Sequence, residues 1–259
     1  MRGFMVILRT EVFSLFISPA TYVSTFYFLA LLGVGFRFFI ESFPSTNWIL
    51  PPLSSLAIGL IFSSPALIPF LTMRTLAEER RLGTLETLMS APVNASSIIF
   101  GKWSASYLFF LVICLGAYAF PLTLCGIFPE QAQTLGFMVK EHWIGGIIFL
   151  MSFGASFTAI GIFSSSVTKN PMVAGMLTFS LITLYLAIMA FSYGTPSPHI
   201  DQNSPNEIIN SMGGSLNNGL DKLHFFAVGV IHVPTIFHQL IVVFLFLSLA
   251  TLQIERMRF

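Results

Sequence analysis

Six apolar stretches, each about 20 residues long or longer, run through this sequence of 259 residues. A helix needs about 20 such residues to cross the hydrocarbon core of a bilayer, where no water is present to bond the backbone. The stretches therefore predict an all-α integral membrane protein with six spanning helices in a single transmembrane domain. The predicted spans are Ala20–Ile40, Leu53–Met73, Ser104–Phe128, Ile144–Val167, Val173–Tyr193 and Pro234–Ile254.

Charged residues are too scarce for a soluble domain of this length. They make up 9% of the chain, against 55% hydrophobic residues, whereas a soluble chain carries about 25% charged residues. The net charge of +1 also excludes nucleic acid as the main partner. Because no nucleotide-binding Gly-x-x-x-x-Gly-Lys-Ser/Thr loop occurs in the sequence, we expect no ATPase site and no cofactor on this chain.

Basic residues predict the orientation of the spans. Residues 1–19 are apolar but interrupted by Arg9, Thr10 and Glu11, which favours an interfacial amphipathic helix over a cleaved signal peptide. With both termini in the cytoplasm, nine basic residues lie inside and two outside, as the positive-inside rule requires. The inner residues are Arg2, Arg9, Arg74, Arg80, Arg81, Lys102, Lys169, Arg256 and Arg258, and the outer ones are Lys140 and Lys222.

The longest outer connection, residues 195–233, leaves two structures open. Its apolar edge, which includes Leu216, Leu220 and Leu223, fits either a helix at the outer interface or an anchored loop. Asp221 and His224 are spaced to share a helix face, but no further ligand joins them. We therefore expect interfacial hydrogen bonding there rather than a metal site.

Within the spans, two patterns favour structural roles. Arg37 and Glu41 are four residues apart at the outer end of the first span, which predicts a local ion pair. A stripe of small residues in the fourth span predicts close helix packing, with a substrate path as the alternative. This stripe consists of Gly154, Thr158, Gly161 and Ser165.

The cytoplasmic segment 74–102 carries the most informative pattern. Gly83 is expected to end one helix and Thr84 to cap a second. On that second helix Leu85, Leu88 and Met89 share an apolar face. A solvated loop would explain the charges alone. A docking helix also explains the apolar face, which needs a partner or the bilayer surface to cover it.

The residues of this segment also carry a resemblance. The run Glu78-Glu79-Arg80-Arg81-Leu82-Gly83-Thr84-Leu85-Glu86, flanked by two spans, resembles the cytoplasmic signature of ABC-2 type transporter permeases. More narrowly, the chain is similar to the gliding-motility-type permeases of that family. Other matching pieces are Thr72-Met73-Arg74, Ala91-Pro92, Ser18-Pro19 with Tyr22, residues 157–170, His224-Phe225 and Gly229-Val230-Ile231.

The resemblance implies a fold and a set of partners. It implies a six-span permease of the ABC-2, type V exporter-like kind, in a bacterial inner membrane. The permease would dimerise with itself or a paralogue and act with a separate ATP-binding subunit that holds ATP and Mg²⁺. An extracytoplasmic auxiliary protein is a further expected partner. The implied direction of transport is export.

The resemblance further implies that residues 74–102 contain a coupling helix that contacts the ATP-binding subunit. The candidate contact residues are Arg74, Glu78, Glu79, Arg80, Arg81, Gly83, Thr84, Leu85, Glu86, Leu88 and Met89. Two other functions stay open from the residues alone: an intramembrane protease-like enzyme, and a passive channel or receptor subunit. A passive channel or receptor subunit would not need such a docking segment, and no histidines lie near Glu78 and Glu79 as a metalloprotease would require.

Overall fold

The computed structural model of the chain describes residues 2–42, 52–85, 94–135, 137, 139–192 and 233–256. Every element of regular structure in these ranges is an α-helix. The helices are α1 (Arg2–Ile17), α2 (Pro19–Ser42), α3 (Pro52–Thr72), α4 (Ala77–Leu82), α6 (Ala95–Ala117), α7 (Ala119–Ile127), α8 (Pro129–Thr134), α9 (Lys140–Val167), α10 (Pro171–Ser192) and α12 (Val233–Glu255).

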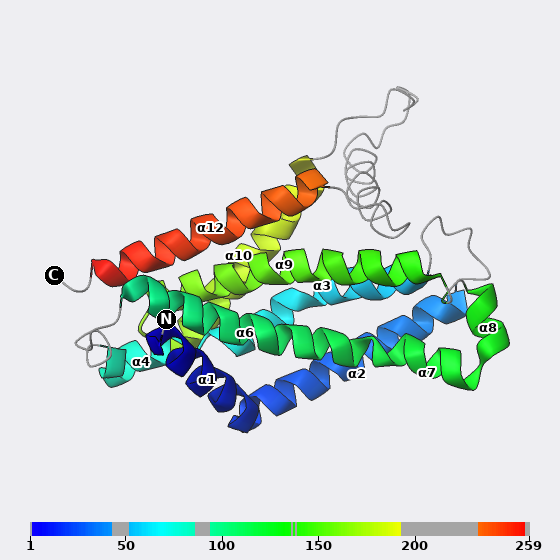
Figure 1. Ribbon diagram of the computed structural model, residues 1–259, viewed down its shortest axis with the longest axis horizontal. Coiled ribbons are helices and arrows are strands. Elements are labelled where there is room, and N and C mark those ends of the chain that lie inside the picture. Colours follow the sequence, from blue (N-terminus) through cyan, green and yellow to red (C-terminus); the bar gives the residue numbers. More distant parts are fainter. Residues whose placement is uncertain are drawn as a thin grey trace, which may run out of the picture.

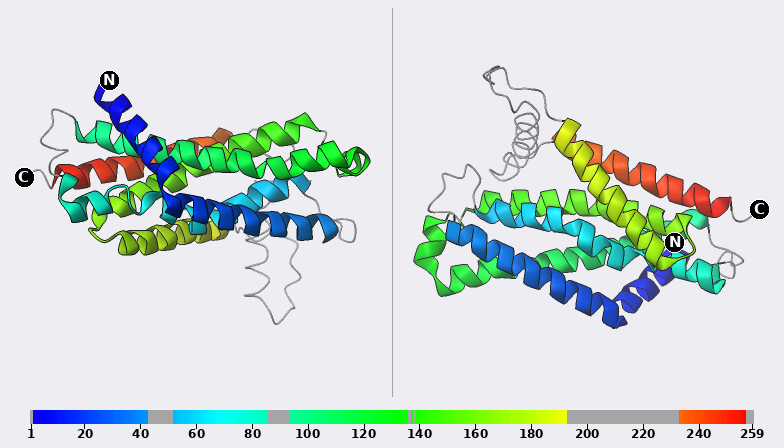
Figure 2. Two further views of the ribbon diagram at one scale, coloured as in Figure 1. Left: turned by 90° about the horizontal axis from the view of Figure 1, so that it is seen from below. Right: turned by 180° about the vertical axis from the view of Figure 1, so that it is seen from behind.

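Six helical stretches among the described residues are long and apolar enough to cross a membrane, which confirms the predicted fold class. They are Pro19–Phe38, Leu56–Leu82, Ala95–Ile127, Lys140–Val167, Pro171–Met189 and Val233–Glu255. The long helices run side by side, with α9 between α12 and the pair α3 and α6 (Figure 1). The views in Figure 2 show α1 crossing this bundle obliquely at one end.

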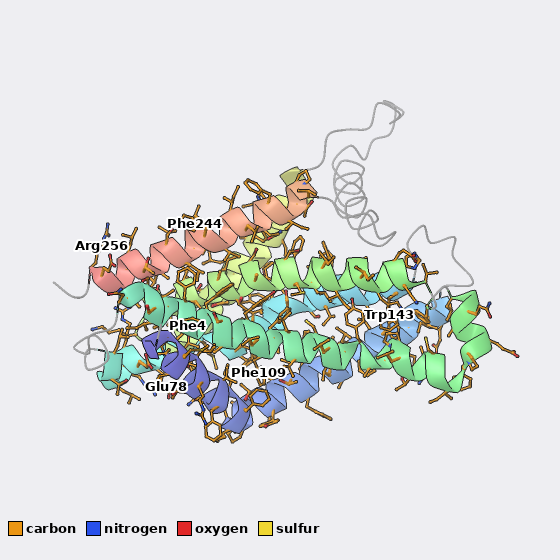
Figure 3. The ribbon with its side chains drawn as sticks, in the orientation of Figure 1. Phe4, Glu78, Phe109, Trp143, Phe244 and Arg256 are labelled. Atoms are coloured by element: carbon orange, nitrogen blue, oxygen red, sulfur yellow. The ribbon has the colours of Figure 1, made fainter. Side chains whose placement is uncertain are left out.

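Helix α1, helix α4 and the C-terminal end of α12 gather at the same end of the bundle (Figure 1). Glu78 and Arg256 mark this end in Figure 3, and Trp143 lies toward the opposite one. The segments predicted to be cytoplasmic therefore share one end, while the side of the membrane that they face stays a prediction.

The N-terminal helix ends near the predicted boundary. Helix α1 stops at Ile17, and Pro19 opens α2, where its fixed φ and missing N–H suit a first helical position. The Thr21 hydroxyl donates to the carbonyl of Leu15 at 2.6 Å across this elbow. The interfacial position of α1 stays a prediction.

The third span differs from its predicted bounds. Helix α6 begins at Ala95 rather than Ser104, so the last part of the predicted cytoplasmic segment 74–102 is the start of a spanning helix. The helix then breaks at Tyr118, between α6 and α7. Pro121 explains the break, because it offers no N–H to the carbonyl of Ala117 and its ring crowds that carbonyl.

Helix α9 forms the centre of the bundle and packs against α3, α6, α10 and α12. Its small residues Gly154, Thr158, Gly161 and Ser165 are all buried, which confirms the prediction of helix packing. A Cβ atom at Gly154 would lie 2.2 Å from the Phe110 ring of α6, and one at Gly161 would lie 2.4 Å from Thr72 Oγ1 of α3. Glycine is therefore required where α9 meets its neighbours.

A buried amide joins α12 to the same helix. The Ser156 hydroxyl of α9 donates to Gln239 Oε1 at 2.6 Å, and the Tyr185 hydroxyl of α10 donates to the same oxygen at 2.9 Å. Gln239 is buried, and its Nε2 has no hydrogen-bond partner. A polar contact inside an apolar bundle fixes the rotation of α12 about its axis.

We predict that Gly161→Ala lowers the stability of the folded chain by about 1–3 kcal/mol, because the new methyl group overlaps Thr72. Thermal melting of the detergent-solubilised protein, followed by size-exclusion chromatography, measures the effect. The matched control is Gly59→Ala in α3, where a Cβ atom meets nothing within 4 Å and alanine favours the helix by up to about 1 kcal/mol. A wild-type melting temperature for Gly161→Ala would contradict the packing argument.

Candidate functional site

The short helix α4 has no N-cap of its own. Its preceding residue, Leu76, makes no side-chain capping bond. Instead, Ser165 of α9 accepts hydrogen bonds from the N–H groups of Leu76 and Ala77 at 3.1 and 3.0 Å. The Ser165 hydroxyl in turn donates to the carbonyl of Met73 at 3.3 Å. One buried serine of a neighbouring helix thus orders the α3–α4 turn and the start of α4.

Helix α4 in turn caps the C-terminal end of α9. The guanidinium of Arg80 donates through Nη1 to the carbonyl of Ser166, in the last turn of α9. The last carbonyls of a helix lack intrahelical donors and carry partial negative charge, so a cation stabilises them. Helices α4 and α9 therefore satisfy each other's backbone ends.

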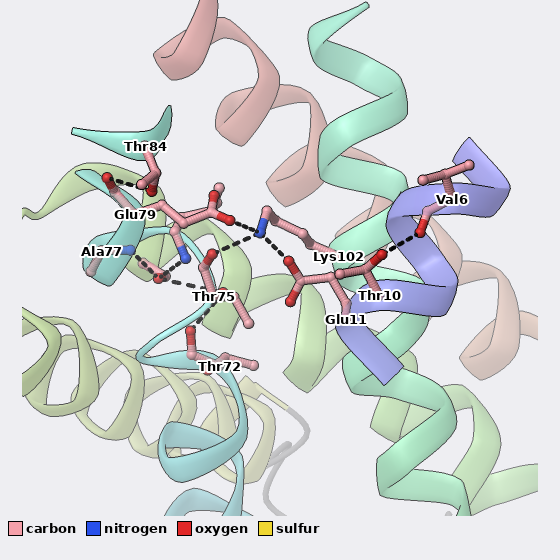
Figure 4. A network of polar contacts seen from close by, with 11 residues as sticks. Val6, Thr10, Glu11, Thr72, Thr75, Ala77, Glu79, Thr84 and Lys102 are labelled. Atoms are coloured by element: carbon pink, nitrogen blue, oxygen red, sulfur yellow. Dashed lines mark hydrogen bonds and ion pairs between the residues drawn. The ribbon is translucent and has the colours of Figure 1, made fainter. Parts of the chain in front are cut away.

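Lys102 of α6 is the charged centre of this region (Figure 4). Its side chain is 1% exposed. The ammonium group donates to Glu79 Oε1 of α4 at 2.8 Å, to the carbonyl of Thr75 at 3.0 Å, and to Glu11 Oε1 of α1. Three acceptors match the three donors of an ammonium group. A single buried cation thus joins α1, the α3–α4 turn, α4 and α6.

We name this arrangement the α4 junction. It consists of Glu11, Thr75, Glu79, Arg80, Lys102, Ser165 and Ser166. Of these, only Glu79 and Arg80 were predicted site residues. Lys102 was counted as a loop cation, Ser165 as a packing residue and Glu11 as an interruption of an interfacial helix. A lysine and a glutamate inside otherwise apolar segments are the signal that could have found the ion pair.

The other charges of α4 lie on its outer side. Arg74 donates to both carboxylate oxygens of Glu78, at 2.6 and 3.1 Å, and Arg81 lies 3.8 Å from the same carboxylate. These side chains are partly or largely exposed, and such surface pairs contribute little stability. They are available to another surface.

The end of α4 presents uncharged groups as well. Gly83 follows the helix with φ 74°, a left-handed conformation that confirms its predicted role as a terminator. Leu82 is 64% exposed, and Gly83 and Thr84 are exposed beside it. The Thr84 hydroxyl donates to the carbonyl of Glu79 at 3.3 Å and so bonds back to α4.

Leu85, another predicted contact residue, is buried within the chain. It is 2% exposed and belongs to the chain's own core with Leu76, Ile99 and Ile254. This core joins residues from distant segments, which the pattern of apolar residues in the segment could not show. Glu86, Leu88 and Met89, also predicted contact residues, lie outside the described residues, as do Asp221 and His224.

A groove of about 530 Å³ borders the α4 junction on the side of the α1–α2 elbow. Ser14, Ser18 and Thr21 line one wall, and Phe70, Arg74 and Glu78 are among the residues of the other. Helix α4 is therefore packed on α9 and α10 but open toward the elbow.

At the other end of the bundle, Arg37 Nε lies 2.8 Å from Glu41 Oε1. This confirms the predicted local ion pair. Both side chains are exposed, so the pair has no role in the described core.

We predict that Lys102→Met destabilises the chain by about 3 kcal/mol, because it leaves Glu11 and Glu79 in a partly buried site without their cation. Thermal melting measures the loss. The triple variant Glu11→Gln, Glu79→Gln, Lys102→Met removes the stranded charges and should recover part of it. If the triple variant melts lower than Lys102→Met alone, the ionic account of the junction is wrong.

A large part of the chain matches the model of a known protein family. A family model described as ABC-2 family transporter protein matches residues 51–212, which is more than half of the chain. No curated protein matches. The matched range contains α4, Lys102, Ser165 and Ser166, and ABC-2 permeases are the transmembrane component of their transporters rather than the ATPase. The chain belongs to the ABC-2 transporter family and is a permease component of an ABC transporter.

Proposed function

We propose that this chain is the permease of an ATP-driven exporter and that α4, with the residues that follow it, is the element on which a separate ATP-binding subunit acts. That subunit would hold ATP and Mg²⁺. The observation that carries the proposal is the two-sided character of α4. One side is joined to the spans through the α4 junction, and the other presents Arg81, Leu82 and Thr84.

The inner side of α4 supports the transmission of force. A helix of six residues is unstable alone, so α4 exists only through its contacts with other helices. Those contacts are hydrogen bonds and an ion pair to α6 and α9, which lie in two different spans. A push on α4 would therefore reach both spans rather than being absorbed in a loose loop.

The outer side of α4 supports docking. Arg81 and Leu82 stand beside each other, and arginine is frequent among the residues that dominate protein interfaces. Leu82 is an exposed apolar side chain in a segment rich in charge. Arg74 and Glu78 extend this surface, while Leu85 is removed from it by burial. Glu86, Leu88 and Met89 remain proposed contacts on sequence grounds.

The finer features of the transporter are also proposals. Helices α2, α10 and α12 bury only 22% of their span residues, which leaves faces for lipid and for a second permease, either the same chain or a paralogue. The chain would span the inner membrane of a bacterial cell six times, with both termini in the cytoplasm. The likeness to gliding-motility permeases, and with it an extracytoplasmic partner, rests on the sequence pieces given above.

We predict that the tagged chain, purified from its native membranes in mild detergent, carries an ATP-binding subunit that Arg81→Glu releases. Loss of an interface arginine costs about 2 kcal/mol, or roughly a thirtyfold loss of affinity. Lys140→Glu, a charge reversal at an exposed lysine that begins α9, is the matched control and should retain the subunit. Recovery of no nucleotide-binding protein with the wild type would refute the proposed function.

A second variant separates docking from transmission. Glu79→Gln keeps the size and an acceptor for Lys102 but removes the charge of the ion pair. We expect the ATP-binding subunit to co-purify with Glu79→Gln at wild-type levels, while stimulation of its ATPase by the permease in lipid nanodiscs falls severalfold. Wild-type stimulation would show that the Lys102–Glu79 contact takes no part in transmission.

A further inference from the structure

Helix α1 has a second face, which points away from the α4 junction. This face borders a groove of about 480 Å³ between α1 and α6. Its α1 residues recur every three to four positions, as neighbours on one helix face do. The lining consists of Met5, Leu8, Arg9, Val12, Phe13, Phe16 and Leu108.

The groove is apolar and uncovered. Met5, Phe13, Phe16 and Leu108 are between 40% and 66% exposed. Exposed apolar side chains also continue along α6 at Val112 and Leu115, four and seven residues beyond Leu108 and hence on the same face. Together they form an exposed apolar strip that runs from α1 along the outside of α6, and such a surface needs a lipid or a partner to cover it.

The two ends of the groove lie at different depths. Ile7 contacts Gly101 near the start of α6, and the Phe16 ring packs against the Phe109 ring at 5.0 Å, two turns further along. Helix α1 therefore descends along α6, and Arg9 lies at the end where α6 begins. In a bilayer that end would meet the lipid headgroups, while Phe13, Phe16 and Leu108 would lie nearer the acyl chains.

Arg9 is the charged residue of the groove lining. Among the described residues no carboxylate forms an ion pair with it. The nearest acid in sequence, Glu11, is already bound to Lys102. A guanidinium without a carboxylate partner matches a phosphate in geometry and charge, and the lining offers no acid to receive the amine of a zwitterionic headgroup.

We propose that this groove binds one anionic glycerophospholipid of the adjoining leaflet. Its phosphate would pair with Arg9, and one acyl chain would lie over Phe13 and Leu108 and along α6. The bound lipid would hold α1 against α6. Because Arg9 is two residues from Glu11, the lipid would lie beside the ion pair between Glu11 and Lys102. The site does not depend on the ATP-binding subunit and can be tested on this chain alone.

Native mass spectrometry of the purified chain tests the site, with phosphatidylglycerol and phosphatidylcholine as competing probes. We expect the wild type to retain phosphatidylglycerol about fivefold better, the factor that one basic side chain contributes near an anionic lipid surface. Arg9→Gln should abolish this preference, and Arg9→Lys should retain part of it. Phe13→Gln, an exposed position that tolerates substitution, should lower retention of both lipids.

The matched control is Arg256→Gln, an exposed arginine at the same end of the bundle that directly follows α12. It should keep the wild-type preference. The proposal fails if the wild type shows no preference for phosphatidylglycerol, or if Arg9→Gln keeps it. It also fails if Arg256→Gln loses as much as Arg9→Gln, because nonspecific attraction would then account for binding, or if Phe13→Gln retains both lipids as the wild type does.

Discussion

The buried ammonium group of Lys102 constrains the arrangement of the whole α4 end of this protein. An ammonium group loses its hydration on burial, at a cost of several kcal/mol unless acceptors replace the water. Here the acceptors come from α1 on one side and from the α3–α4 turn and α4 on the other, two parts of the chain that are far apart in sequence. No single segment can move away without leaving the cation short of a partner. The position of α4 is therefore linked to that of α1 and α6.

Helix α9 supplies the second half of this constraint. Its glycines allow α3 and α6 to approach until side chains of those helices touch its backbone. The same close approach brings Ser165 within hydrogen-bond distance of the N–H groups of Leu76 and Ala77. The close packing of the spans and the ordering of the short helix α4 therefore have the same cause. Small side chains on α9 let the neighbouring spans pack closely along its length, and at its end one of them accepts the hydrogen bonds that begin α4.

The sequence predicts those features that depend on local patterns. Apolar length predicts the six spans, Gly83 predicts the end of a helix, and the spacing of Arg37 and Glu41 predicts an ion pair. The α4 junction depends instead on contacts between distant segments. Lys102 looks like the last residue of a loop until α6 is seen to begin at Ala95, and Leu85 looks exposed until it is seen to belong to a core with Ile99 and Ile254. Both outcomes follow from tertiary packing, which helical periodicity alone does not encode.

The way α4 is capped limits how it can move. Its first N–H groups depend on Ser165, and the last carbonyls of α9 depend on Arg80. Sliding α4 across α9 would leave unsatisfied backbone groups at both helix ends, each costing about 1–3 kcal/mol in a buried site. Motion of α4 together with α9 keeps every one of these bonds. The groove beside the α1–α2 elbow leaves one side of α4 open, so the bonds to α9 and to Lys102 are what hold α4 in place. A force on α4 is therefore passed to α9 through these bonds, because sliding between the two helices would cost more than moving them as one unit.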